Sequence, residues 1–72
     1  MATHRETYFT CTYASRDTRR TAVVPAWDAH MAEALFRDLL AEEPVEAGGV
    51  IEVEEPGGKL ACRAAFQPAP AL

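Results

Sequence analysis

An amphipathic segment in the middle of the chain, bounded by Pro25 and Pro44, most constrains the fold. Asp28 is a good N-cap for this segment, because its carboxylate can accept the unpaired amides of a first helical turn. Pro25 at the first helical position is an alternative start. Pro44 disfavours helical geometry in the residue before it, so we expect the helix to end near Glu42 or Glu43. The sequence therefore predicts a helix between these limits.

Apolar residues recur along this segment at three- and four-residue spacing, which is typical of one buried helix face. They are Met31, Ala32, Leu35, Phe36 and Leu39. The opposite side carries His30, Glu33, Arg37 and Ala41. Glu33 and Arg37 are four residues apart in the order that favours an ion pair on a helix surface. We expect the apolar stripe to face the core.

The residues before the helix predict a β-hairpin. Residues 7–13 are β-branched and aromatic, and alternation places Phe9, Cys11 and Tyr13 on one face. Tyr8, Thr10 and Thr12 fall on the other face. The polar residues 14–17 can turn, and residues 18–24 can return as a second strand. Pro25 has no amide proton for a ladder, so pairing should stop at or before it.

The residues after the helix predict a second hairpin, from residues 50–54 and 59–66 around Pro56-Gly57-Gly58. If Pro56 and Gly57 are the two central turn residues, the register pairs Val53 with Leu60, Ile51 with Cys62 and Glu54 with Lys59. This register places the apolar residues of the last strand on one face: Leu60, Cys62, Ala64 and Phe66.

Together these segments predict an α+β fold. Residues 1–66 form a single small two-layer domain in ββαββ order, a four-stranded antiparallel sheet with one helix packed on one face. The other face shows a mixed polar surface of Tyr8, Thr10, Thr12, Glu52, Glu54, Lys59 and Arg63. Residues 67–72 are expected to be a disordered Pro/Ala tail. A free sheet edge on so small a domain invites pairing, which leaves a homodimer open.

The composition points to a cytoplasmic protein without a membrane partner. No apolar run approaches the roughly 18 residues of a membrane span, and residues 1–6 are too polar for a signal peptide. The two cysteines, Cys11 and Cys62, could form one bridge if the fold brings them together. In a reducing compartment, two buried free thiols are the favoured interpretation.

The sequence carries no pattern of catalysis, metal binding or cofactor binding. A zinc site usually draws its ligands from closely spaced pairs, whereas His4, Cys11, His30 and Cys62 are scattered. Nucleophilic catalysis needs a base in reach of the thiol, and we expect His30 and the cysteines to face different ways. The paired glycines at 48–49 and 57–58 belong to turns and not to a phosphate loop. We therefore expect no enzyme, no metal and no cofactor.

Charge is segregated along the chain, whose formal net charge is −4. Residues 28–55 hold one arginine against nine acids, whereas the segments on either side are each net +2. Such segregation can steer a complementary partner. We therefore expect a non-catalytic protein-interaction module that docks through an acidic surface or a sheet edge onto a protein with a basic surface. The candidate contacts are Glu42, Glu43, Glu46, Glu52, Glu54 and Glu55.

One version of this module is an inhibitor of a nucleic-acid-binding protein machine. Small phage-encoded inhibitors of bacterial defence, such as anti-CRISPR proteins, are similar in size and acidity but share no motif with this chain. The alternative is a small nucleic-acid-binding module that uses Arg16, Arg19 and Arg20, with Tyr8 stacking on a base. The negative net charge makes nucleic acid the less favoured partner. Trp27, just before the helix, is expected in the core.

Overall fold

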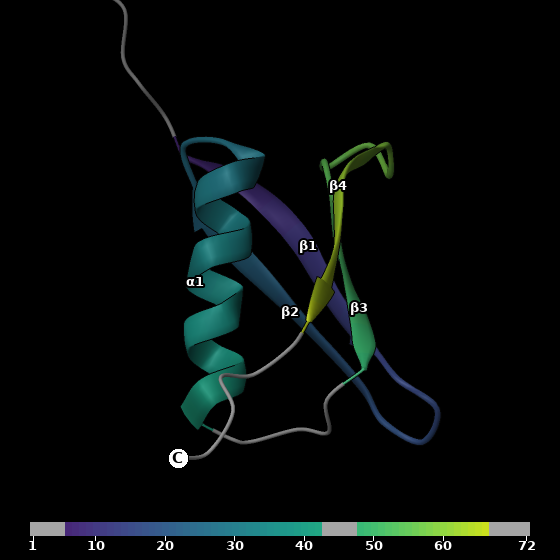
Figure 1. Cartoon of the computed structure of the whole chain (residues 1–72). Helices are drawn as coiled ribbons and strands as arrows, with labels where there is room; N and C mark the ends of the chain where they lie inside the picture. The colour runs from purple at the N-terminus through teal and green to yellow at the C-terminus, as the bar shows by residue number, and fades with distance from the viewer. Residues whose placement is uncertain (1–5, 43–47, 67–72) are drawn as a thin grey trace, which may run out of the picture.

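The structure is a computed structural model, and it describes residues 6–42 and 48–66. Its elements are β1 (Thr7–Ala14), β2 (Arg19–Ala26), α1 (Ala29–Glu42), β3 (Gly49–Glu54) and β4 (Leu60–Phe66). The strands form one antiparallel sheet in the order β2-β1-β3-β4. Figure 1 shows α1 running along one side of this sheet. The predicted α+β fold with ββαββ order is confirmed.

Strand β1 lies at the centre of the sheet and follows the predicted alternation. Its Phe9, Cys11 and Tyr13 are buried, while Tyr8 is exposed. The helix-covered face holds the core, which consists of Phe9, Cys11, Tyr13, Val24, Ala26, Ala32, Phe36, Leu40, Ile51, Val53 and Phe66. One apolar layer between sheet and helix thus accounts for the buried side chains of the described residues.

Strand β2 continues through Pro25 to Ala26, so the prediction that pairing stops at this proline is wrong. The amide of Ser15 donates to the carbonyl of Thr18 at 2.8 Å, which sets the phase of the β1–β2 ladder. Because hydrogen-bonded pairs alternate along an antiparallel ladder, the nitrogen of Pro25 points away from β1. β2 is an edge strand, where a proline in that position removes no ladder hydrogen bond.

The β3–β4 register also differs from the predicted one, by one residue at Glu54 and by two residues from Val53 onward. Gly58 donates to Glu55 at 2.8 Å, so Pro56 and Gly57 are central in the turn, but Gly58 follows with a φ of 92° as an additional loop residue. A register shift beside Val53 and Glu54 then skips one residue of β4. The two one-residue shifts together leave Cys62, Ala64 and Phe66 on the predicted face. Leu60 lies between the two shifts and opposes Glu54 on the other face, so its predicted place on the same face as Cys62 is wrong. The observed pairs are Val53 with Cys62, Ile51 with Ala64, Glu52 with Arg63 and Glu54 with Leu60.

The helix begins as predicted but is rotated about its axis. Asp28 accepts a hydrogen bond from the amide of Met31 at 2.8 Å, which is the expected N-cap. The buried residues are Ala32, Phe36 and Leu40, whereas Leu35 and Leu39 are 37% and 47% exposed. The predicted stripe is therefore wrong for Leu35 and Leu39. The helix packs on the sheet through Ala32, Phe36 and Leu40, which lie four residues apart along it.

Trp27 is 52% exposed, so its predicted place in the core is also wrong. It follows the end of β2 directly, where the chain leaves the sheet to enter the helix. Several sequence predictions fall outside the described residues: His4, Glu43, Pro44, Glu46 and the tail 67–72. Within the described residues, the helix is neither long nor apolar enough to cross a membrane.

Candidate functional site

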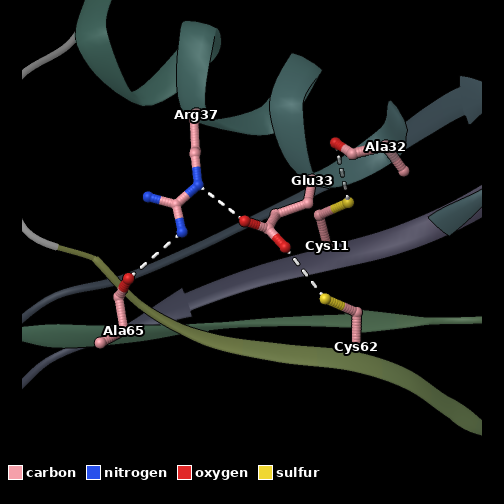
Figure 2. A network of polar contacts seen from close by, with 6 residues as sticks. All are labelled: Cys11, Ala32, Glu33, Arg37, Cys62 and Ala65. Carbon is pink, nitrogen blue, oxygen red and sulfur yellow. Dashed lines mark hydrogen bonds and ion pairs between the residues drawn. The ribbon is translucent and has the colours of Figure 1, made fainter. Parts of the chain in front are cut away.

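A polar network lies between α1 and β4, the edge strand of the sheet (Figure 2). The Cys62 thiol on β4 donates to Glu33 Oε1 at 2.9 Å, and Arg37 Nε donates to Glu33 Oε2 at 2.8 Å. The predicted Glu33–Arg37 pair is thus present, but it faces β4 and not open solvent. The Glu33 side chain is 15% exposed.

Arg37 connects this network to the end of β4. Its Nη2 donates to the backbone carbonyl of Ala65 at 3.2 Å, and its guanidinium lies 5.9 Å from the centre of the Phe66 ring. Phe66 in turn meets Tyr13 edge-on, with ring centres 5.4 Å apart. The three contacts of one arginine hold the end of β4 against the helix.

The contacts in and beside this network shift the pKa values of Glu33, Cys62 and Cys11. Hydrogen bonds from Cys62 and Arg37 lower the pKa of Glu33, and the bond to Glu33 raises the pKa of Cys62. Burial raises the pKa of Cys11 to about 11. The Cys11 thiol has only a weak contact, with the carbonyl of Ala32 at 3.9 Å. Both thiols are therefore protonated at neutral pH, and a protonated thiol is a poor nucleophile.

The two cysteines are not placed to form a disulfide or a metal site. Cys11 and Cys62 both oppose Val53, from the strands on its two sides, so their Cα atoms lie about 9.5 Å apart at ordinary strand spacing. A disulfide requires less than about 7 Å. Both are free thiols, and no group of three metal-ligating side chains gathers among residues 6–42 and 48–66.

Acid should weaken the fold through Glu33. Its pKa is lower in the folded chain than in the unfolded chain, so its contribution to stability is present above the unfolded pKa, about 4.3. That contribution is lost as the pH falls through the folded pKa. Cys11, His30, Arg37 and Cys62 are the titratable groups that act on or face this carboxylate. We expect the Tm of the wild type to fall steeply below about pH 4.5.

Glu33→Gln provides the comparison. At neutral pH this variant should lose about 1.5–3 kcal/mol, the net contribution of a hydrogen bond to a charged group. Its loss of Tm on acidification should be smaller than that of the wild type, so the two curves approach each other as the pH falls through the folded pKa of Glu33. Thermal unfolding between pH 3 and pH 7 measures both curves, and parallel curves would contradict this role of Glu33.

The uncovered face of the sheet has an apolar end. One row of paired residues crosses all four strands: Val23, Thr10, Glu54 and Leu60. Tyr8 and Pro25 form the next pair on the same face. Tyr8 and Val23 are each 62% exposed, and Leu60 is 48% exposed. We call Tyr8, Val23, Pro25 and Leu60 the open-face patch; Glu54 lies in the same row, between Thr10 and Leu60.

The candidate acidic contacts are divided between two sides of the molecule. Glu52 and Glu54 are on the open face, and Glu55 begins the adjoining turn. Glu42 ends the helix on the other side of the sheet, and Glu43 and Glu46 are outside the described residues. Glu52 Oε2 forms an ion pair with Arg63 Nε on the neighbouring strand β4, at 3.5 Å. The structure thus brings three of the six acids together, at the open face and its turn.

The candidate nucleic-acid contacts are not gathered at one place. Arg16 is in the β1–β2 turn, Arg19 is on the open face opposite Ala14, and Arg20 opposes the buried Tyr13 on the helix-covered side. Tyr8 is six residues from Ala14 along β1, about 20 Å away. A base stacked on Tyr8 would therefore lie far from these three arginines.

Sequence patterns did not identify Val23 and Leu60 as surface residues. Val23 alternates with the buried Val24, and period-two alternation alone could have assigned it to the open face. Leu60 reaches that face only through the register shift beside Val53 and Glu54. No strong sequence signal marks such an irregularity.

Comparisons of the chain with protein-family models, with curated proteins and with solved structures find no match. Any functional proposal therefore depends on the residues of this chain alone.

Proposed function

We propose that this chain is a non-catalytic protein-interaction module that docks a protein partner on the open face of its sheet. The observation that carries this proposal is the open-face patch beside Glu54. Large apolar side chains at high exposure, on β1 and on both edge strands of one sheet face, are typical of a contact surface. Tyrosine also contributes strongly to protein interfaces, because it offers a large contact area and a polar hydroxyl.

The charges beside the patch favour a partner with a basic surface. Glu54 lies in the row between Val23 and Leu60, and Glu52 precedes it by two residues on the same strand and face. Burying a carboxylate at an interface is favourable only when a cation meets it. The partner should therefore present a lysine or arginine among apolar side chains. Inhibition of a nucleic-acid-binding machine, through its basic surface, is one version of this proposal.

The thiol chemistry supports a role without catalysis. Cys11 and Cys62 are the most nucleophilic residue types of the described chain, and their raised pKa values keep them protonated. Glu33 accepts hydrogen bonds from Cys62 and Arg37 and so acts as a structural acceptor. These groups stabilise the fold that carries the open face.

A pull-down from extract of the native cell, with nuclease treatment, tests the proposal. The tested variants are the double variant Tyr8→Ser with Leu60→Ser and the charge reversal Glu54→Lys. Their matched controls are Thr12→Ser with Ala65→Ser on the same face, and Glu55→Lys at the turn. A stoichiometric protein partner should survive nuclease, be lost with both tested variants and be retained by both controls.

Two results would contradict the proposal. A partner retained equally by the tested variants and the controls would mean that docking uses another surface. Recovery of nucleic acid alone, lost with nuclease or with added salt, would favour the arginine-based alternative instead. Circular dichroism of each variant shows that the loss of binding is not a loss of fold.

A further inference from the structure

The outer edge of β2 offers backbone groups to another strand. The Ser15–Thr18 hydrogen bond sets the phase of the ladder, so Arg20, Ala22 and Val24 bond to β1. The alternate residues Arg19, Thr21, Val23 and Pro25 point their backbone groups away from the sheet. Three of these four have an amide proton, and β2 has no neighbour on this side in the described sheet.

The residues along this edge restrict how a strand can add to it. Pro25 supplies no donor, so a ladder cannot extend past Val23 at that end. Arg19 begins the strand at the other end, directly after the turn. The usable stretch is therefore five residues long and is centred on Thr21. A copy of the same stretch, running antiparallel, satisfies every outward amide when Thr21 faces its own equivalent.

We propose that a second copy of this chain pairs with this edge, β2 against β2, with Thr21 opposite Thr21 of the second copy. Arg19 of each copy then opposes Val23 of the other, which also separates the two Arg19 side chains. The three outward amides of each strand all donate to the other strand. The two sheets become one sheet of eight strands, with a two-fold axis at Thr21.

The helix beside this edge gives the pairing an apolar contact. A hollow of about 410 Å³ lies between α1 and β2, and its lining includes Ala22, Phe36 and Leu39. Leu35 and Leu39 are exposed on the same helix and belong to one row, four residues apart. An axis perpendicular to the sheet keeps both helices on one face. The exposed leucines of the two copies then face each other across the axis. The second copy therefore covers both the edge of β2 and the exposed leucines of the helix.

This dimer differs from the partner docking proposed above. It uses the edge of β2 and the helix-covered side, whereas the open-face patch lies on the other side of the sheet. The dimer brings Arg19 of the second copy beside Val23, but it leaves Tyr8 on β1 and Leu60 on β4, the patch residues changed in the docking test, away from the new contact. Failure of either proposal is therefore distinguishable from failure of the other.

Disulfide trapping tests the register directly. Facing hydrogen-bonded residues have Cα atoms about 5.5 Å apart, which suits a disulfide, so Thr21→Cys should form a covalent dimer under mild oxidation. Val23→Cys alone should not, because its equivalents would be about 13 Å apart. A mixture of Arg19→Cys and Val23→Cys chains should form the mixed dimer. The wild type is the control for Cys11 and Cys62.

Light scattering across a range of protein concentrations measures the reversible dimerisation, without a disulfide. The wild type should reach the mass of two chains, Thr21→Pro should stay monomeric at least ten times higher in concentration, and Thr21→Val should dimerise like the wild type. Leu39→Glu changes the helix alone, so it decides the result if Thr21→Pro does not fold. A wild type that stays monomeric at millimolar concentration, or a dimer that Leu39→Glu and Thr21→Pro leave unchanged, would overturn the proposal. So would trapping of Val23→Cys as readily as Thr21→Cys.

Discussion

Gly49→Ala should destabilise the fold by about 3 kcal/mol, the upper part of the range for an overpacked core. A Cβ on Gly49 would lie 2.6 Å from the hydroxyl oxygen of Tyr13 and closer still to two carbons of that ring. Tyr13 is fully buried and packs edge-on against Phe66, so its ring has no free space to move into. Denaturation with urea, followed by circular dichroism, measures the loss.

The other glycines provide controls for this prediction. A Cβ on Gly57 meets nothing within 4 Å, and Gly57 does not have a positive φ, so Gly57→Ala should change stability by less than about 0.5 kcal/mol. Gly48 is equally open but has a φ of 93°, so Gly48→Ala should lose about 1 kcal/mol through backbone strain. Equal effects at all three positions would contradict the overlap with Tyr13.

Gly49 illustrates which parts of this fold a sequence encodes locally. Its place at a chain break was readable, because paired glycines end regular structure. The contact of Gly49 with Tyr13 is between residues more than 30 positions apart, and it depends on β1 pairing with β3. Sequence patterns predicted the strands but not this strand neighbour.

The alternation in β1 was predictable for a simple reason. A central strand with one covered face must place every second residue in the core, and the sequence of β1 alternates without interruption. β4 lacks this property, because its register depends on Gly58 and on a shift beside Val53. Either the extra loop residue or the shift alone would turn the side chains of β4 to the opposite face of the sheet. Both together return Cys62, Ala64 and Phe66 to the predicted face.

The polar network and the acidic candidates depend on tertiary placement as well. Glu33 and Arg37 were expected on the solvent side of the helix, yet rotation of the helix brings them to β4. The acidic candidates of the open face are two residues apart in one strand, which is why Glu52 and Glu54 were correctly assigned to one strand face. Glu42 is distant from them because it belongs to the other layer. Sequence proximity thus identified part of the candidate site, and the layers divided the rest.

The helix provides the second large effect, because the rotation about its axis separates two neighbouring residues. Phe36 is 2% exposed and its ring packs in the core, whereas Leu35 beside it is 37% exposed. Phe36→Ala should therefore lose about 3 kcal/mol, the lower end of the usual cost of truncating a buried phenylalanine. The lower end applies because Phe36 also lines the hollow beside β2, where water can enter the space that the ring leaves.

Leu35→Ala is the matched control for Phe36→Ala, one residue away on the same helix. Because more than a third of Leu35 stays in water in the folded chain, its truncation should lose only about 1 kcal/mol. Urea denaturation at low protein concentration keeps any contact between two copies from adding to this loss. Similar losses of stability in the two variants would mean that Leu35 and Phe36 are both buried, as the sequence alone predicts. A difference of about 2 kcal/mol would establish the rotated helix, and with it the exposed row of Leu35 and Leu39 that faces the second copy.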